Sequence, residues 1–134
     1  MTDVPTETGP TLEVAQAGPA SGASGRWLVA FDVANRGREP VALLEAWLPH
    51  GRFRCAEQPL ADVLPPGGGT TLSFEVAFDE EPGAEVENAF VILQVRWREG
   101  AWRVMTRLTV TARADGAPEA ATQLLTAHRV GFSG

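Results

Sequence analysis

The feature that most constrains this sequence is an alternation of apolar and polar residues that recurs through residues 27–112. Residues 72–78 show it most clearly, with an apolar side chain at every second position. Because successive side chains of a β-strand point to opposite faces, this period predicts strands with one buried and one solvated face. Turn-forming residues separate these segments at short intervals, so we predict an all-β chain.

The strands can be placed from the same alternation. The segment 18–25, rich in Gly, Ser and Ala, is predicted to be a loop, and Glu99-Gly100 to be the turn of a hairpin between the last two strands. Seven or eight short strands at this spacing are typical of an antiparallel two-sheet sandwich. The predicted strands are residues 11–17, 26–35, 41–48, 52–55, 60–64, 70–78, 89–98 and 102–113.

The pattern changes after residue 113. Ala121, Leu124, Leu125 and His128 are three or four positions apart, which predicts one face of a short helix over residues 118–129. The predicted organisation is therefore a flexible lead-in (1–10), a sandwich (11–113) and a C-terminal helix or tail (114–134).

Composition narrows the class of protein. The 134 residues carry a formal net charge of −6 and are 44% hydrophobic, which fits one globular domain. Nucleic acids and anionic membranes need clustered positive charge, so neither is a predicted partner. The first ten residues lack the apolar run of a secretory signal, and we expect a cytoplasmic protein. All eleven basic residues are Arg, a bias that suggests a bacterial source.

Three short motifs carry a resemblance to a known group of domains. Val-Ala-Asn-Arg-Gly at 33–37 is followed by an apolar strand, and Leu-Pro-Pro-Gly at 64–67 leads into Thr-Leu-Ser-Phe at 71–74. This order resembles bacterial immunoglobulin-like modules of the fibronectin-type-III-like and cell-adhesion-related kinds, over roughly residues 11–112. The resemblance implies a sandwich that binds or spaces rather than catalyses. With one Cys and no Tyr, the chain lacks the disulfide and tyrosine corner of antibody domains, so the sandwich topology stays open.

The predicted last hairpin has two distinct faces. With Glu99-Gly100 as its turn, Trp97 would oppose Trp102 and Arg96 would oppose Arg103. One face, predicted to be core, carries Val91, Leu93, Val95, Trp97, Trp102, Val104 and Leu108. The other carries Phe90, Ile92, Gln94, Arg96, Arg103, Met105 and Arg107.

This second face mixes Arg with large apolar residues, which is unusual for a solvated surface. In a sandwich the strand 41–48 would lie beside it and add Glu45 and Trp47; its alternate residues Ala42, Leu44, Ala46 and Leu48 would face the core. One interpretation is a self-contained ladder in which Glu45 pairs with an Arg and Trp47 stacks on a guanidinium. The other is a protein interface, since interfaces concentrate Trp, Arg and Met. The predicted interaction face is Trp47, Phe90, Ile92, Arg96, Arg103, Met105 and Arg107, with a tail contact at Leu124 and Leu125.

Catalytic and metal sites are not predicted. Cys55 and His50 are five residues apart with no acid placed to orient the ring, as a nucleophile would require. The acids of residues 79–87 lack the ligand spacing of a calcium loop, and two His residues with one Cys do not make a zinc site. We therefore expect no enzyme, no cofactor and no metal.

The predicted function is a non-catalytic protein–protein interaction module that binds a partner protein or a second copy of itself. The alternative is a sandwich that binds a small molecule or carbohydrate between loops bearing Trp27, Pro49 and His50. Trp27, Trp97 and Trp102 could form a stacking platform, but packing in the core is the favoured role for the last two.

Overall fold

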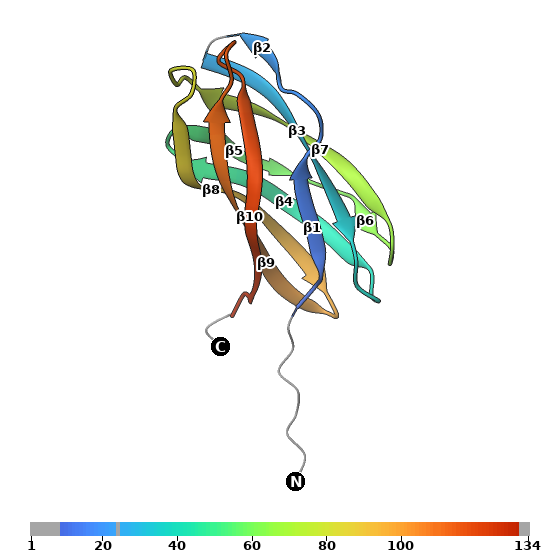
Figure 1. Ribbon diagram of the computed structural model, residues 1–134. Coiled ribbons are helices and arrows are strands. Elements are labelled where there is room, and N and C mark those ends of the chain that lie inside the picture. Colours follow the sequence, from blue (N-terminus) through green and yellow to red (C-terminus); the bar gives the residue numbers. More distant parts are fainter. Residues whose placement is uncertain (1–8, 24, 132–134) are drawn as a thin grey trace.

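The computed structural model describes residues 9–23 and 25–131, and within these ranges the chain is antiparallel β-structure without a helix (Figure 1). The all-β prediction is therefore confirmed. The strands are β1 (Leu12–Gln16), β2 (Ser21–Ala23), β3 (Gly25–Asn35), β4 (Val41–His50), β5 (Phe53–Pro59), β6 (Val63–Leu64), β7 (Gly69–Phe78), β8 (Glu85–Trp97), β9 (Gly100–Ala112) and β10 (Pro118–Arg129).

The strands form one continuous sheet instead of two fully separated ones. Its order is β1-β3-β7-β5-β4-β8-β9-β10, while β2 pairs with β3 and β6 pairs with β4 at the margins. The sheet curls until β1 and β10 lie side by side, which gives a nearly closed barrel (Figure 1). No described part of the chain forms a helix with the length and apolarity to cross a membrane.

Two junctions of this barrel are weak. Between β5 and β7 only Arg54 and Ala77 are paired. Between β1 and β10 the described contacts are made by side chains: Gln16 and Thr122 bond to the backbone of the opposite strand. We call this second junction the seam, and it divides the wall of the barrel at the first and last strands.

The alternating residues of the long strands fill the interior. In β3 and β7 every second residue is buried, and Phe31 packs edge-on against Phe74 with ring centroids 6.0 Å apart. Phe53 and Phe78 repeat this arrangement. Such aromatic pairs stabilise the core by more than the burial of their area alone would. They therefore help to fix which side chains of β3, β5 and β7 face inward.

The link between β3 and β4 is held by the side chain of Asn35, the last residue of β3. The side chain is fully buried, and its Nδ2 donates hydrogen bonds to the carbonyls of Glu39 (2.8 Å) and Leu64 (3.0 Å). Its Oδ1 accepts one from the backbone N–H of Gly37 at 2.9 Å. One amide thus joins the end of β3 to the following turn and to β6.

The predicted C-terminal helix is wrong, because residues 118–129 form strand β10, paired antiparallel with β9 along almost its whole length. The bulge at Gln123 interrupts the strand period, so the spacing of the apolar residues resembles that of a helix. Without β10, β9 would expose a long unpaired edge, and a three-turn helix is marginal on its own. Backbone pairing with β9 therefore decides the structure.

Three smaller predictions also need correction. The predicted loop 18–25 contains the short edge strand β2. In β4 a bulge between Leu43 and Glu45 reverses the parity, so the buried residues are Val41, Leu43, Ala46 and Leu48, and only the second half of the predicted inward set is right. Of the predicted flexible lead-in, residues 1–8 lie outside the described residues, whereas Gly9 and Pro10 are buried. Gly9 has φ 84°, and an added Cβ would come within 2.7 Å of the Trp102 ring, so only glycine fits there.

Candidate interaction face

The last hairpin keeps the predicted parity although its turn lies one residue earlier than predicted. Arg98 and Glu99 have φ of 50° and 61°, and Trp97 pairs with Gly100. Two successive positive φ angles are the geometry of a type I′ turn, whose twist suits a two-residue hairpin. The predicted pairing of Trp97 with Trp102 is therefore wrong. Each partner moves by two positions, so every side chain keeps its face.

The outer surfaces of β4, β8, β9 and β10 bring the predicted residues together in rows that cross the strands. The first row is Trp47, Ile92, Met105 and Thr126, and the second is Glu45, Gln94, Arg103 and His128. The third row is Phe90, Arg107 and Leu124, and Arg96 lies between Ala42 and Ala101 in a fourth. We call these four rows the outer face.

Part of the outer face covers itself. Ile92 points outward and lies outside the main core cluster, yet it is only 7% exposed. Its row neighbours Trp47 and Met105 are half-buried, and the Arg103 guanidinium lies over the Trp47 ring at 5.5 Å from its centroid. The predicted stacking of Trp47 on a guanidinium is thus confirmed, an interaction worth about 1 kcal/mol at an exposed site.

The charges of the outer face are unbalanced. Arg96, Arg103 and Arg107 are exposed, and Glu45 is the single acid in the four rows. Among the described residues, Glu45 forms no ion pair with these arginines, so this part of the predicted ladder is absent. The outer face therefore carries positive charge that its own rows do not neutralise.

The two leucines of the predicted tail contact point in opposite directions. Leu124 lies on the outer face beside Arg107 and is 49% exposed, whereas Leu125 packs against the core. Leu124, Thr126 and His128 join the outer face only because residues 118–129 are a strand. Assignment of this segment as a strand, with alternate residues outward, would have identified them from the sequence.

The pair Cys55 and His50 does not form a nucleophilic site. Burial raises the pKa of the Cys55 thiol, although a backbone hydrogen bond from Glu75 partly opposes this, and its Sγ lies 4.0 Å from Gln58 Oε1. His50 Nδ1 accepts a hydrogen bond from the backbone N–H of Arg52 at 3.0 Å. A thiol with a raised pKa and no base in reach is a weak nucleophile.

The tryptophans predicted to pack do so. Trp97 and Trp102 are buried and meet edge-on with centroids 5.6 Å apart, while the Arg98 guanidinium lies over the Trp97 ring and that of Arg129 over the Trp102 ring. Trp27 is also buried, so it offers no exposed ring between the loops of the ligand-binding alternative.

One acid of the connection 79–87 forms an ion pair with β5's neighbouring loop residue Arg52, and backbone hydrogen bonds from Gly83 and to Ala84 tie the connection to Ala112. Glu80 forms a two-point ion pair with Arg52, and the hydrogen bonds from this guanidinium hold the pKa of the Glu80 carboxyl below its ordinary value. Within the described ranges, no three His, Cys, Asp or Glu side chains come together as a metal site would require.

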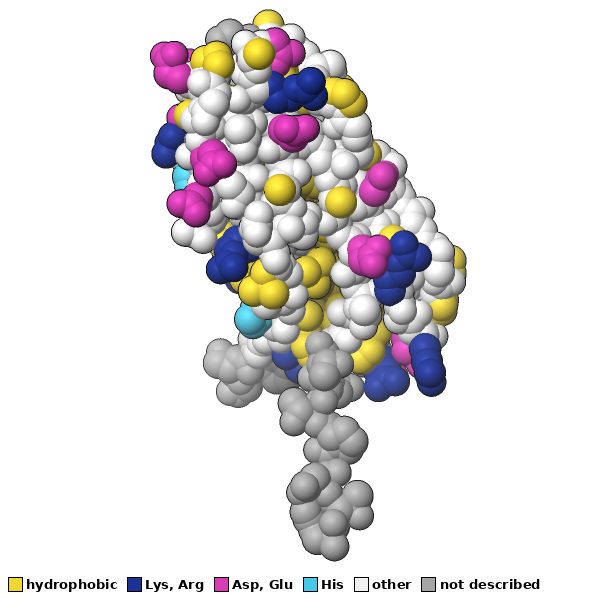
Figure 2. All heavy atoms as spheres, in the orientation of Figure 1, with side chains coloured by type: hydrophobic (Ala, Val, Ile, Leu, Met, Phe, Trp, Pro, Cys, Tyr) yellow, Lys and Arg dark blue, Asp and Glu magenta, His cyan; other side chains and the backbone are white. Residues whose placement is uncertain are grey.

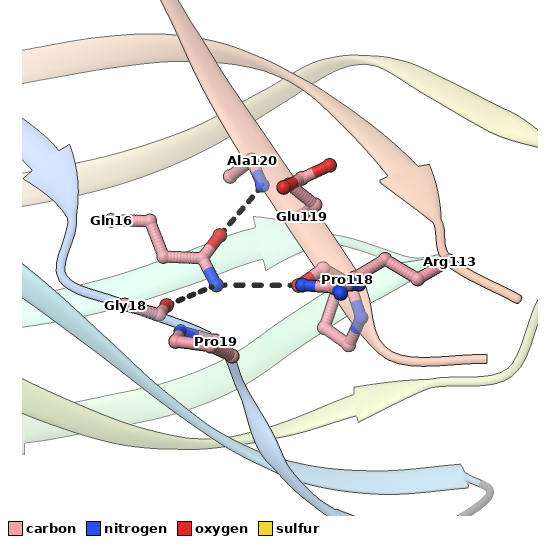
Figure 3. A pocket seen from close by; sticks show the side chains of 7 residues that line it. All are labelled: Gln16, Gly18, Pro19, Arg113, Pro118, Glu119 and Ala120. Carbon is pink, nitrogen blue, oxygen red and sulfur yellow. Dashed lines mark hydrogen bonds between the residues drawn. The ribbon is translucent and has the colours of Figure 1, made fainter. Parts of the chain in front are cut away.

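A shallow hollow of about 260 Å³ lies at one end of the seam, between β1 and β10 (Figure 3). The Gln16 amide spans it: Nε2 donates to the carbonyls of Gly18 (3.1 Å) and Pro118 (3.3 Å), and Oε1 accepts from the N–H of Ala120 (2.6 Å). Farther along the seam, hydrophobic side chains reach the surface between the two strands (Figure 2). Because the Gln16 amide is already hydrogen-bonded to backbone groups on both sides of the hollow, its role is to join β1 to β10 and so help close the barrel.

No protein-family model and no curated protein sequence matches this chain.

Proposed function

We propose that this protein is a non-catalytic protein–protein interaction module and that the outer face is its contact surface. The observation that carries the proposal is the mixture of residues there: three exposed arginines, one acid, and large apolar side chains between them. Arginine and aromatic residues are enriched at the centres of interfaces, where the arginine can pair with acids while its stem covers apolar surface.

The partner that we propose is a second copy of this chain. The whole chain has a formal net charge of −6, although its outer face is positive, so the acids are concentrated elsewhere. Asp79, Glu81 and Glu85 are exposed in and beside the 79–87 connection, and they could meet Arg96 and Arg107 of a neighbour. Complementary charge of this kind speeds association and fixes orientation.

The resemblance to immunoglobulin-like modules forms part of the same proposal. The single pair between β5 and β7 and the side-chain seam between β1 and β10 divide the barrel into a β1-β3-β7 part and a β5-β4-β8-β9-β10 part. We interpret this arrangement as a sandwich whose two layers join along both margins. In such modules binding is more common than catalysis, which supports a contact role.

The test is the mass of the purified protein in solution as a function of concentration, measured by light scattering. We expect the wild type to exceed the monomer mass, and the double variant Arg103→Glu/Met105→Ser to remain monomeric because it reverses a charge and removes apolar area. Arg54→Glu is the matched control, since Arg54 is an exposed arginine of β5 outside the four rows.

Thermal melts of all variants show whether the double variant is folded. A wild type that is monomeric at every concentration refutes self-association, and capture of a different acidic protein would then identify another partner. If Arg54→Glu disrupts assembly as strongly as the double variant, the outer face is not the contact surface.

A further inference from the structure

Strand β9 is flanked by a bulge on each side at the same level. On the β8 side, Val86 pairs with Val110 and Ala89 with Leu108, so two residues of β8, Glu87 and Asn88, stand opposite Thr109 alone. On the β10 side, the register shifts at Gln123, between Thr122 and Leu124. Bulges redirect side chains and are frequent beside functional sites.

The two bulges frame a hollow of about 260 Å³ on the outer surface. Five polar side chains line it, together with Leu108, and none of them makes a side-chain hydrogen bond or ion pair with another described residue. The backbone at Asn88 is held with φ 59°, a conformation that Asn tolerates better than most residues. The five polar residues are Glu87, Asn88, Arg107, Thr109 and Gln123.

The chemistry of this lining favours a neutral ligand rich in hydroxyl groups. One guanidinium and one carboxylate balance each other, so a simple ion of either sign gains little there. Carboxylate, guanidinium and carboxamide are planar groups that bond at two points, and adjacent hydroxyls of a sugar can both donate to them and accept from them.

The volume of the hollow narrows the class of ligand further. Pockets for drug-sized ligands are about 300–1,000 Å³, so this hollow suits one small ring or the end of a chain. We propose that the hollow between the two bulges binds a neutral carbohydrate through one sugar ring. This site adjoins the proposed contact with a second copy and shares Arg107 with it, whereas Glu87, Asn88 and Gln123 lie outside the four rows.

The experiment is a titration of the ¹⁵N-labelled full chain with glucose, galactose, mannose and N-acetylglucosamine, each to about 50 mM, followed by amide chemical shifts. We expect at least one sugar to bind with a millimolar Kd and to shift amides of residues 86–90, 107–109 and 122–124. Glu87→Ala and Gln123→Ala should each weaken binding about tenfold, since each removes hydrogen bonds to the ring. Gln58→Ala, a change in an amide on β5, is the control and should leave the Kd unchanged.

The proposal fails if none of the four sugars shifts these amides or if the shifts cluster elsewhere. It also fails if inorganic phosphate produces the same shifts at lower concentration, because the site would then select anions. Spectra of the variants without sugar show that they are folded. The same titration of the Arg103→Glu/Met105→Ser variant, which is expected to be monomeric, keeps a second copy from covering Arg107. Failure of the sugar site is then distinguishable from failure of self-association.

Discussion

Two threonines near the seam offer a paired test of how hydroxyl groups are satisfied in this barrel. Thr106 of β9 is fully buried and lies between Val91 and Leu125 in register, and its Oγ1 has no hydrogen-bond partner among the residues that the structure describes. Thr122 of β10 donates from Oγ1 to the Val14 carbonyl across the seam at 2.8 Å. The same substitution, Thr→Val, should therefore have opposite effects at the two positions.

The magnitudes follow from the cost of burying an unpaired hydroxyl. Such a group destabilises by about 1–3 kcal/mol, so Thr106→Val should raise the free energy of unfolding by at least about 1 kcal/mol. In a domain of this size that corresponds to a Tm about 4 °C higher. Thr122→Val loses one partly buried hydrogen bond and should lower the free energy of unfolding by about 1 kcal/mol.

Urea unfolding followed by tryptophan fluorescence measures both variants, and an unchanged m-value would show that the folded and unfolded states keep their exposed areas. Valine favours strands slightly more than threonine does at either site, so the difference between the variants isolates the hydroxyl. If both variants lose stability equally, the Thr106 hydroxyl is satisfied after all and the reasoning is wrong.

Three further results are expected. Asn35→Ala should lower the free energy of unfolding by about 3 kcal/mol, because it removes a buried hydrogen bond to the Leu64 carbonyl and two partly buried ones, to the Glu39 carbonyl and from the Gly37 N–H. Denaturant unfolding checks this against Asp32→Ala, which alters one exposed bond. The pKa of Glu80 is held below its ordinary value of 4.5, so its ion pair with Arg52 stabilises the fold above about pH 5 and is lost as pH falls through the folded pKa. Stability measured from pH 3 to 7 should therefore depend less on pH in Glu80→Gln than in wild type, and an unchanged profile would contradict the pairing. Cys55 should react slowly with iodoacetamide at pH 8 and faster in urea, because burial raises its pKa and restricts access; a rate equal to that of free cysteine would contradict this.

Much of the fold can be predicted from alternation because the long strands each have one face in the core. In β7 the alternation of buried and exposed residues continues from Leu72 to Phe78 without a break. In the last hairpin the predicted faces are correct although the predicted turn is wrong, because each residue pairs two positions away from its predicted partner, and a shift by two leaves every side chain on the same face. The outer-face position of Trp47 beside Ile92 was predictable for the same reason.

The predictions failed where a bulge interrupts the alternation of a strand, or where backbone pairing with a neighbouring strand outweighs the local spacing of apolar residues. Leu44 lies at a bulge, and nothing in the alternation of residues 41–48 signals that an extra residue is present. Residues 118–129 contain a second bulge at Gln123, which disguises the period of a strand as that of a helix. The hollow beside β9 depends on two such bulges together, so it could not be predicted from either segment alone.

Because β1 and β10 are neighbours, the described chain enters and leaves the barrel at the same end: a Cβ on Gly9 would lie 3.0 Å from that of Ala127. Tension applied to both ends of the described chain would pull β1 and β10 apart across the seam. The hydrogen bonds of Thr122 and Gln16 would then break one after the other instead of resisting the force together. We expect the barrel to open there by peeling at low force, with the β3–β7 and β8–β9 pairs still intact.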